Sequence, residues 1–178
     1  MVAIKNLVLF VAAATALPAA IEKRDAFSSL QDDLAKIHDK AGKIVKDMPS
    51  CDGVFCAMRL KGQADDIKDL LEDATKDITS ASKSFSDSES KKIVTMLDGT
   101  LEKDITGVLH GVERHEKLKG LKGLKGRVKP YLEDLKVDIK DFGDALTKKV
   151  SKDSVEKVRK EVDEMEAEAE QAIKVYSE

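Results

Sequence analysis

The chain has 178 residues, of which 37% are charged and only 4% aromatic, and its formal net charge is −3 at neutral pH. Acidic and basic residues alternate along its length, and this near-balance argues against a nucleic-acid-binding protein, which would need a basic face. The length suits one domain of ordinary size. The composition indicates a soluble protein with a highly charged surface.

The first residues form an export signal. Lys5 supplies a positive start, residues 7–17 are an apolar run, and the small residues that end at Ala16 are typical of a signal-peptidase cleavage site. The run is too short to span a bilayer, so it is interpreted as a removable signal and not as an anchor. We expect a secreted protein without a transmembrane segment in its mature form.

A dibasic pair, Lys23 and Arg24, lies behind the signal and directly precedes Asp25. This placement predicts cleavage by a fungal furin-type protease, and two ordinary charges in a linker are the alternative. We therefore divide the chain into a signal with a short pro-segment, residues 1–24, and a single helical domain, residues 25–178. Removal of three basic residues and one acidic residue leaves 28 basic and 33 acidic side chains, a net charge of −5.

Beyond the dibasic pair, apolar residues recur three or four positions apart, which is the period of an amphipathic helix. Five such segments follow one another, at residues 27–48, 60–85, 86–112, 128–146 and 155–176. Each carries one apolar stripe and short connections join them, so the sequence predicts an all-α antiparallel bundle of about five amphipathic helices. One continuous coiled coil is the alternative, but proline, serine-rich and glycine-rich stretches interrupt the pattern.

Local signals mark where these helices begin and end. The stretch from Pro49 to Gly53 stops the first helix. Residues 86–89 and 153–156 read Ser-Asp-Ser-Glu and Asp-Ser-Val-Glu, which are typical of capping boxes that satisfy free amide donors at a helix start. We expect the third and fifth helices to begin there.

Two cysteines, Cys51 and Cys56, lie close together after the first helix. In an exported protein such a pair predicts a structural disulfide, which would stabilise the fold by about 2 kcal/mol. A zinc site and a redox dithiol are the alternatives. The pair supplies only two metal ligands with no histidine nearby, and a redox motif would place two residues between the cysteines.

A threefold Leu-Lys-Gly repeat occupies residues 118–126. A helix through it would carry three glycines, at a cost of roughly 3 kcal/mol relative to alanine, so we expect a loop or a frayed helix end. Its leucines and lysines suit a contact with an interface or an anionic lipid. A flexible linker that grew by repeat slippage is an equally good interpretation.

The sequence lacks the parts of an enzyme. His38 follows a core position and is expected to face solvent, and His110 and His115 are five apart, which is not the spacing of two metal ligands on one helical face. The carboxylates fall on polar faces, where they support helices and do not form the buried pairs that acid–base catalysis needs. We predict no catalytic residue, no metal site and no cofactor.

The apolar stripes themselves are the candidate binding element. Small residues within them either let helices approach closely, which is ordinary packing, or leave a gap for an acyl chain or a sterol. If a cavity forms, its expected lining comes from mid-helix positions of three segments: Leu97, Leu101, Ile105, Leu135, Ile139, Phe142, Val162 and Met165. A second route needs no cavity, because a bundle with thin apolar seams can open onto an oil, wax or plastic surface.

The order of these patterns resembles a known family, the fungal hydrophobic surface binding protein A group, also called cell wall galactomannoproteins. The resemblance rests on the dibasic pair and on the apolar spacings that begin at Leu30, Ile93 and Val128 and end at Tyr176. It implies a secreted or wall-associated helical bundle that adsorbs to hydrophobic surfaces, recruits polymer-degrading hydrolases to them, or holds fatty acids or sterols between its helices. The cysteine pair and the tripeptide repeat depart from the family pattern.

Two functions therefore remain open. The first is a non-catalytic protein that binds lipids or hydrophobic surfaces and recruits secreted hydrolases. The second is a secreted protein-interaction module, an adhesin or host-directed effector, that acts through its charged outer faces. Because the chain ends without an apolar tail, free secretion is expected over attachment to the wall.

Overall fold

The computed structural model describes residues 25–51, 53–114 and 125–177. Within these residues the secondary structure is helical throughout, without a strand, and the all-α prediction is confirmed. The elements are α1 (Ala26–Asp47), η1 (Met48–Ser50), α2 (Gly53–Ser80), α3 (Asp87–Met96), η2 (Leu97–Leu101), α4 (Glu102–Arg114), α6 (Lys125–Thr147) and α7 (Lys152–Val175). None of the helices in this part of the chain is long and apolar enough to cross a membrane.

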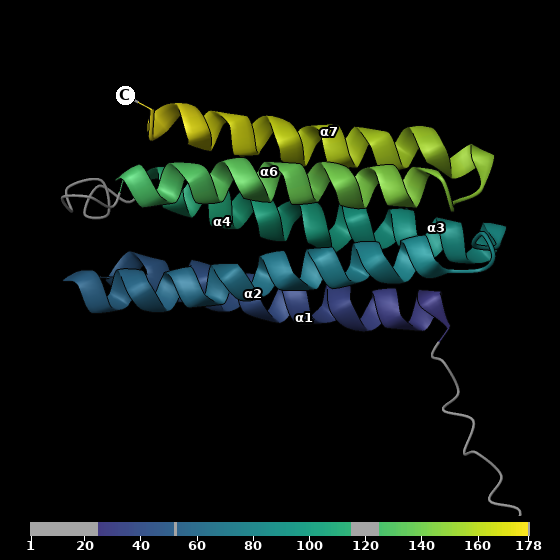
Figure 1. Cartoon of the computed structure of the whole chain (residues 1–178), viewed down its shortest axis with the longest axis horizontal. Coiled ribbons are helices and arrows are strands. Elements are labelled where there is room, and N and C mark those ends of the chain that lie inside the picture. Colours follow the sequence, from purple (N-terminus) through teal and green to yellow (C-terminus); the bar gives the residue numbers. More distant parts are fainter. Residues whose placement is uncertain (1–24, 52, 115–124, 178) are drawn as a thin grey trace, which may run out of the picture.

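The bundle consists of five long rods, because α3, η2 and α4 follow one another without a break and form a single rod, the third rod. Each rod runs opposite to the one before it in the chain, as predicted (Figure 1). In cross-section the main packing partners close a ring in the order α1, α2, α6, α7, third rod and back to α1. Each rod thus turns one face to a shared interior.

Sequence neighbours are not always ring neighbours. The α2 helix packs on α1 and α6, whereas the third rod packs on α1 and α7. The connection at residues 81–86 therefore crosses one end of the ring. Three of the five ring contacts, α2 with α6, α7 with the third rod, and the third rod with α1, consequently pair rods that run in the same direction (Figure 1).

The two ends of the bundle differ in how they are built. At the network end, on the right in Figure 1, α1 begins and the connections at residues 81–86 and 148–151 lie together. The disulfide end, on the left, holds η1 and the Cys51–Cys56 bond, together with the start of α2, the end of α4, the start of α6 and the end of α7.

The network end is held by hydrogen bonds between connections that are far apart in sequence. The backbone N–H of Phe85 donates to the carbonyl of Lys149 at 2.8 Å, and Lys149 Nζ donates to the carbonyl of Ala81 at 2.6 Å. The N–H of Ser151 donates to the Oγ of the fully buried Ser90 at 2.9 Å. These bonds satisfy polar groups that the crossing connection would otherwise bury without partners.

The second predicted segment is wrong at its end. We expected a stripe through Ala81 and Phe85, but α2 ends at Ser80. Phe85 is nevertheless buried, because the crossing connection turns its ring onto Phe27 of α1, with the centroids 6.3 Å apart and the rings edge to face. Tertiary packing therefore buries a residue that helical periodicity had placed on the helix.

One of the two predicted capping boxes forms. The N–H of Glu89 donates to Ser86 Oγ at 3.3 Å, and the N–H of Ser86 donates to the Glu89 carboxylate at 2.7 Å. The box predicted at residues 153–156 is wrong: α7 begins at Lys152 with Ser151 as its N-cap residue. The bond from Ser151 to the third rod fixes the start of α7 earlier than the local pattern indicated.

The π-helical turn η2 corrects the phase of the third rod. Its apolar residues are spaced by four: Ile93, Leu97, Leu101, Ile105 and Leu109. At 100° per residue, such a stripe would drift by about 160° around an ideal α-helix, and one extra residue in a turn reduces the drift to about 60°. All five side chains are at most 1% exposed, so the π-helical turn keeps the stripe directed at the ring interior.

Several predictions fall outside the described residues. The signal, with cleavage at Ala16, and the dibasic site at Lys23 and Arg24 lie there, as does most of the tripeptide repeat. The repeat's last two residues, Lys125 and Gly126, belong to α6. The stop of the first helix is confirmed, since α1 ends at Asp47 and a 3₁₀ turn containing Pro49 follows.

Candidate functional site

The ring interior is the candidate site. The eight residues predicted to line a cavity are all at most 5% exposed and belong to one continuous apolar cluster, and they come from the third rod, α6 and α7: Leu97, Leu101, Ile105, Leu135, Ile139, Phe142, Val162 and Met165. These three rods are consecutive in the ring. The structure therefore gathers the predicted residues along one side of a shared interior.

The sequence interpretation left out the other side of the interior. The α1 and α2 helices contribute residues of the same cluster, each at most 5% exposed: Leu34, Ile37, Ala41, Ile44, Ile67, Leu71 and Ala74. The signal was present, because these residues form the first two predicted stripes. Only the ring order, with α1 and α2 facing the other three rods, shows that they share one interior.

The composition of the interior changes along the bundle axis. The buried phenylalanines Phe27, Phe85 and Phe142 lie within two turns of the network end, and the buried Tyr176 lies at the disulfide end. The middle is aliphatic, and the buried residues near the rod centres are Ile37, Ile67, Leu101, Leu135 and Val162. For rods about 9 Å apart, the centre of a five-membered ring is about 8 Å from each axis, against about 6 Å in a four-membered ring. Branched aliphatic residues thus occupy the middle of the ring interior.

Two glycines allow close contacts between rods. A Cβ at Gly143 would lie 2.6 Å from Val162 Cγ1, and one at Gly111 would lie 2.5 Å from Met48 Sδ. Of the two roles predicted for small residues, close approach is the one found at these positions. Gly99, within the π-helical turn, has no neighbouring atom within 4 Å of the place where a Cβ would stand.

Two tyrosines connect rods at the disulfide end. Tyr131 OH donates to the carbonyl of Ala64 at 2.6 Å and joins α6 to α2, while Tyr176 OH donates to the carbonyl of Val112 at 2.8 Å and joins α7 to α4. Burial raises the pKa of Tyr131 well above its usual value and that of Tyr176 to about 12, with the Glu113 carboxylate adding to the latter shift. Both phenols therefore stay neutral donors.

A half-buried ion cluster flanks Tyr131 on the outer seam between α2 and α6. Lys68 Nζ lies 5.4 Å from the centre of the Tyr131 ring, 3.4 Å from Asp134 and 3.8 Å from Asp138. Burial raises the pKa of Asp138 despite the opposing charge of Lys68. The cluster lies on the outside of the ring and stabilises the seam between two parallel rods.

Two histidines contact carboxylates on other rods. His38 Nδ1 lies 2.8 Å from Asp104 and joins α1 to α4, and His110 Nε2 lies 2.8 Å from Glu168 and joins α4 to α7. His38 is exposed as predicted, and His115 lies outside the described residues. In the described part of the chain, no group of His, Cys, Asp and Glu side chains is arranged to hold a metal ion.

The predicted disulfide is present. Cys51 and Cys56 are bonded, with their Cα atoms 5.4 Å apart, and the bond joins the end of η1 to the first turn of α2. Cys51 is 1% exposed and is part of the apolar cluster. The bond therefore fixes the turn between two helices and does not cross the ring.

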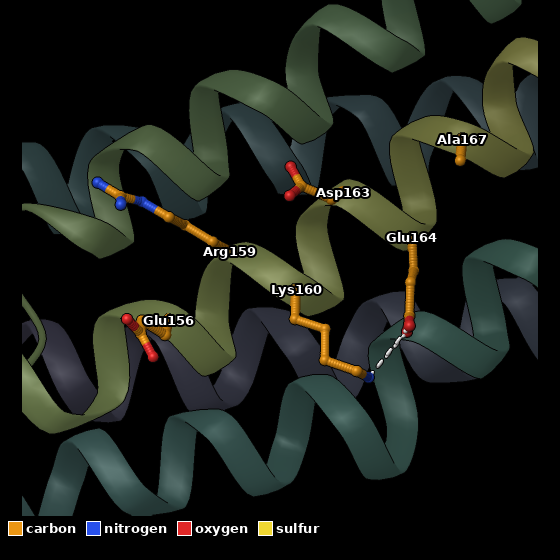
Figure 2. A pocket seen from close by; sticks show the side chains of 6 residues that line it. All are labelled: Glu156, Arg159, Lys160, Asp163, Glu164 and Ala167. Atoms are coloured by element: carbon orange, nitrogen blue, oxygen red, sulfur yellow. Dashed lines mark hydrogen bonds and ion pairs between the residues drawn. The ribbon is translucent and has the colours of Figure 1, made fainter.

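A charged hollow lies on the outer face of α7. It is lined by Glu156, Arg159, Lys160, Asp163, Glu164 and Ala167, all from this one helix (Figure 2). Lys160 Nζ lies 3.1 Å from Glu164, and Figure 2 shows Arg159 and Lys160 pointing to opposite sides of α7. The charged groups at its rim distinguish it from the aliphatic interior.

Comparisons with known proteins agree with this architecture. The structure of AFMP4P in complex with palmitic acid has a TM-score of 0.77 and 19% identity, and the match covers 85% of this chain and 99% of that one. Ligand binding domain 1 of Penicillium marneffei MP1 protein, complexed with arachidonic acids, gives 0.76 and 17%, with 86% and 99% covered. Domain 2 of the same protein, complexed with multiple arachidonic acids, gives 0.76 and 18%, with 88% and 98% covered.

No protein of curated function matches the sequence. The family model described as hydrophobic surface binding protein A matches residues 27–148, which include α1, α2, the third rod and α6. The match spans more than half of the chain and covers four of the five rods. The chain therefore belongs to the hydrophobic surface binding protein A family.

Proposed function

We propose that this protein is a secreted, non-catalytic carrier that holds a single-chain lipid, such as a fatty acid, inside its five-rod ring. The observation that carries the proposal is the aliphatic middle of the interior, where branched residues from all five rods belong to one buried apolar cluster. An acyl chain suits this interior because it offers no polar group that would need a buried partner.

The similarity of fold supports the same conclusion. The structures with palmitic and arachidonic acids share the topology over nearly their whole length, at identities of 17–19%. At this identity the side chains differ, whereas the ring of rods is retained. We therefore propose fatty acids as the ligand class of this chain. We propose that its lining consists of the eight predicted residues and the apolar stripes of α1 and α2.

Native mass spectrometry of the chain with added palmitic acid tests the proposal. We expect a mass excess of one fatty acid that disappears on denaturation. Ile139→Asp places a carboxylate in the interior and should abolish the excess, whereas Val137→Asp, the same change at a 55% exposed position of the same helix, should retain it. No excess in the unmodified chain, or retained binding in a folded Ile139→Asp variant, would contradict an internal site.

Because the aspartate variant risks unfolding, a second variant keeps the test decisive. Leu101→Phe adds volume at the centre of the third rod without adding charge. In a filled core such overpacking costs about 1–3 kcal/mol, whereas in a lipid site it displaces the ligand with little loss of stability. We expect weaker palmitate binding in a variant whose melting temperature is nearly unchanged.

Adsorption to hydrophobic solids and recruitment of secreted hydrolases are part of the proposal. The family description supports the first, and the charged hollow on α7 is a described surface that suits a polar contact with a hydrolase. Salt separates the two contacts: apolar adsorption persists at high ionic strength, whereas a charge-led contact weakens sharply. The same hollow also suits the second candidate function, a protein-interaction module. That function is favoured if the chain holds no lipid and a protein partner binds it less tightly as the salt concentration rises.

A further inference from the structure

The disulfide end carries an unusual pair of exposed apolar side chains. Phe55 is 90% exposed and Met58 is 64% exposed, three residues apart in the first turns of α2. Residues three apart lie on one face of a helix, so the two side chains point the same way. A phenylalanine this exposed gains nothing from the fold, and we look for its partner outside the chain.

The charge around this pair is positive although the protein as a whole is acidic. The described helix ends at this end of the bundle, residues 41–51, 53–61, 108–114, 126–131 and 170–177, contain eight lysines and arginines but only three acidic residues. The basic side chains of Lys46, Arg59 and Arg127 are exposed.

The network end provides the comparison. Residues 25–32, 74–93 and 141–158 contain eight basic and nine acidic residues, so this end is nearly neutral. Its three phenylalanines, Phe27, Phe85 and Phe142, are buried. Exposed apolar side chains and excess positive charge therefore coincide at one end only.

Contacts place the helix ends of the disulfide end together. Arg59 lies 3.7 Å from Asp47 at the end of α1, and Gly111 of α4 lies against Met48 of η1. The α6 helix joins α2 through the Tyr131 hydroxyl. The basic helix ends thus surround the start of α2, from which Phe55 and Met58 project.

We propose that this tip docks the protein onto a lipid bilayer with anionic headgroups, with Phe55 and Met58 inserted between the acyl chains and the surrounding cations at the headgroup level. Apolar side chains at the acyl boundary combined with cations at anionic headgroups are the two contributions that hold proteins at a membrane surface. The inference goes beyond the proposed lipid carrier, since it uses residues outside the ring interior.

The experiment exploits the absence of tryptophan from the chain. Phe55→Trp introduces a single fluorophore at the tip, and Val137→Trp introduces one at an exposed apolar position on the side of the bundle. Both variants are titrated with vesicles of phosphatidylcholine alone and of an equimolar mixture of phosphatidylcholine and phosphatidylglycerol. We expect the emission of the Phe55→Trp variant to shift to the blue with the anionic vesicles only, and that of the Val137→Trp variant to stay unchanged with both.

Co-sedimentation with the same anionic vesicles gives the loss-of-function measurement. Phe55→Ser/Met58→Ser should lower the bound fraction at least about tenfold, and Val137→Ser should leave it unchanged. Unaltered binding of the double variant, or equal binding of the unmodified chain to neutral vesicles, would overturn the proposal. Both changed positions are exposed, so the fold is retained, as a thermal melt followed by circular dichroism will show.

The outcome is separable from the proposed carrier function. Palmitate binding of Phe55→Ser/Met58→Ser, measured by native mass spectrometry, should equal that of the unmodified chain. One outcome is that palmitate binds neither to the unmodified chain nor to the double variant, while anionic vesicles bind the unmodified chain more strongly than the double variant. The carrier function is then wrong and the docking tip is supported. The opposite outcome is that palmitate binds to both proteins and anionic vesicles bind both equally. The docking tip is then wrong and the carrier function is supported.

Discussion

The two ends of the bundle show two ways to finish a ring of helices. At the network end, a connection crosses the ring and is held by backbone hydrogen bonds and buried aromatic rings. At the disulfide end, a covalent bond fixes one local turn, two tyrosine hydroxyls join pairs of rods, and apolar side chains remain exposed. The comparison separates an end built for stability from one whose surface is free for contact.

Phenylalanine truncation tests the comparison most strongly. Phe85→Ala at the network end removes a buried ring that covers the interior and packs on Phe27, so we expect the free energy of unfolding to fall by about 3–5 kcal/mol. Phe55→Ala at the disulfide end should change it by less than about 0.5 kcal/mol. Urea denaturation of both variants measures the difference, and equal losses would remove the distinction between the ends.

Breaking the disulfide tests how much the covalent bond contributes. In Cys51→Ser/Cys56→Ser the unfolded chain regains the freedom of a short loop, and we expect a loss of about 2 kcal/mol. The helical circular dichroism at low temperature should be unchanged, because the bond does not cross the ring. A collapse of the helical signal would show that the disulfide holds the bundle together and does more than fix a turn.

Glycine-to-alanine changes compare packing near each end. Gly143→Ala places a Cβ 2.6 Å from Val162 Cγ1 and should lower stability by about 1–3 kcal/mol. Gly62→Ala in α2, where no atom lies within 4 Å of the new Cβ, should raise it by roughly 0.5–1 kcal/mol because alanine favours the helix. Thermal melts of the two variants should shift in opposite directions, and a stabilising Gly143→Ala would show that α6 and α7 are not in close contact.

Tyr176 offers the finest test of the disulfide end. Tyr176→Phe removes the hydrogen bond to Val112 and should cost about 1 kcal/mol at neutral pH. The folded state raises the pKa of this phenol from 10.0 to about 12, so its contribution is complete below pH 10 and is lost as the pH rises to 12. Between pH 10 and 12, the free energy of unfolding should fall less steeply in the phenylalanine variant than in the unmodified chain. Parallel curves would contradict a raised pKa for Tyr176.

Much of the fold was predictable because it depends on local rules. The stop at Pro49, the capping box at Ser86 and the disulfide all arise from residues that lie close together in sequence. The two boundary errors, at Phe85 and Ser151, have a common cause: each residue bonds across the network end to an element more than 60 residues away. Periodicity within one segment contains no information about such a partner.

For the candidate site, the sequence identified which faces are apolar, and the eight predicted residues are all buried. Burial is common to a lining and to an ordinary core, so the lining stays a prediction. It did not indicate that α1 and α2 complete the same interior, nor that Phe55 and Met58 stay exposed among the described residues. Both facts depend on the order of the rods around the ring, and stripes of equal hydrophobicity do not encode that order.

By itself, the sequence determined the helical class, the number of rods and the short-range cross-link, because hydrophobic period, breakers and cysteine spacing act over a few residues. The tertiary structure alone decided the closed ring with its parallel neighbours, the crossing connection and the positive, apolar tip. These features arise when several rods bury one interior together, and the free energy of that shared burial depends on contacts between segments far apart in the chain.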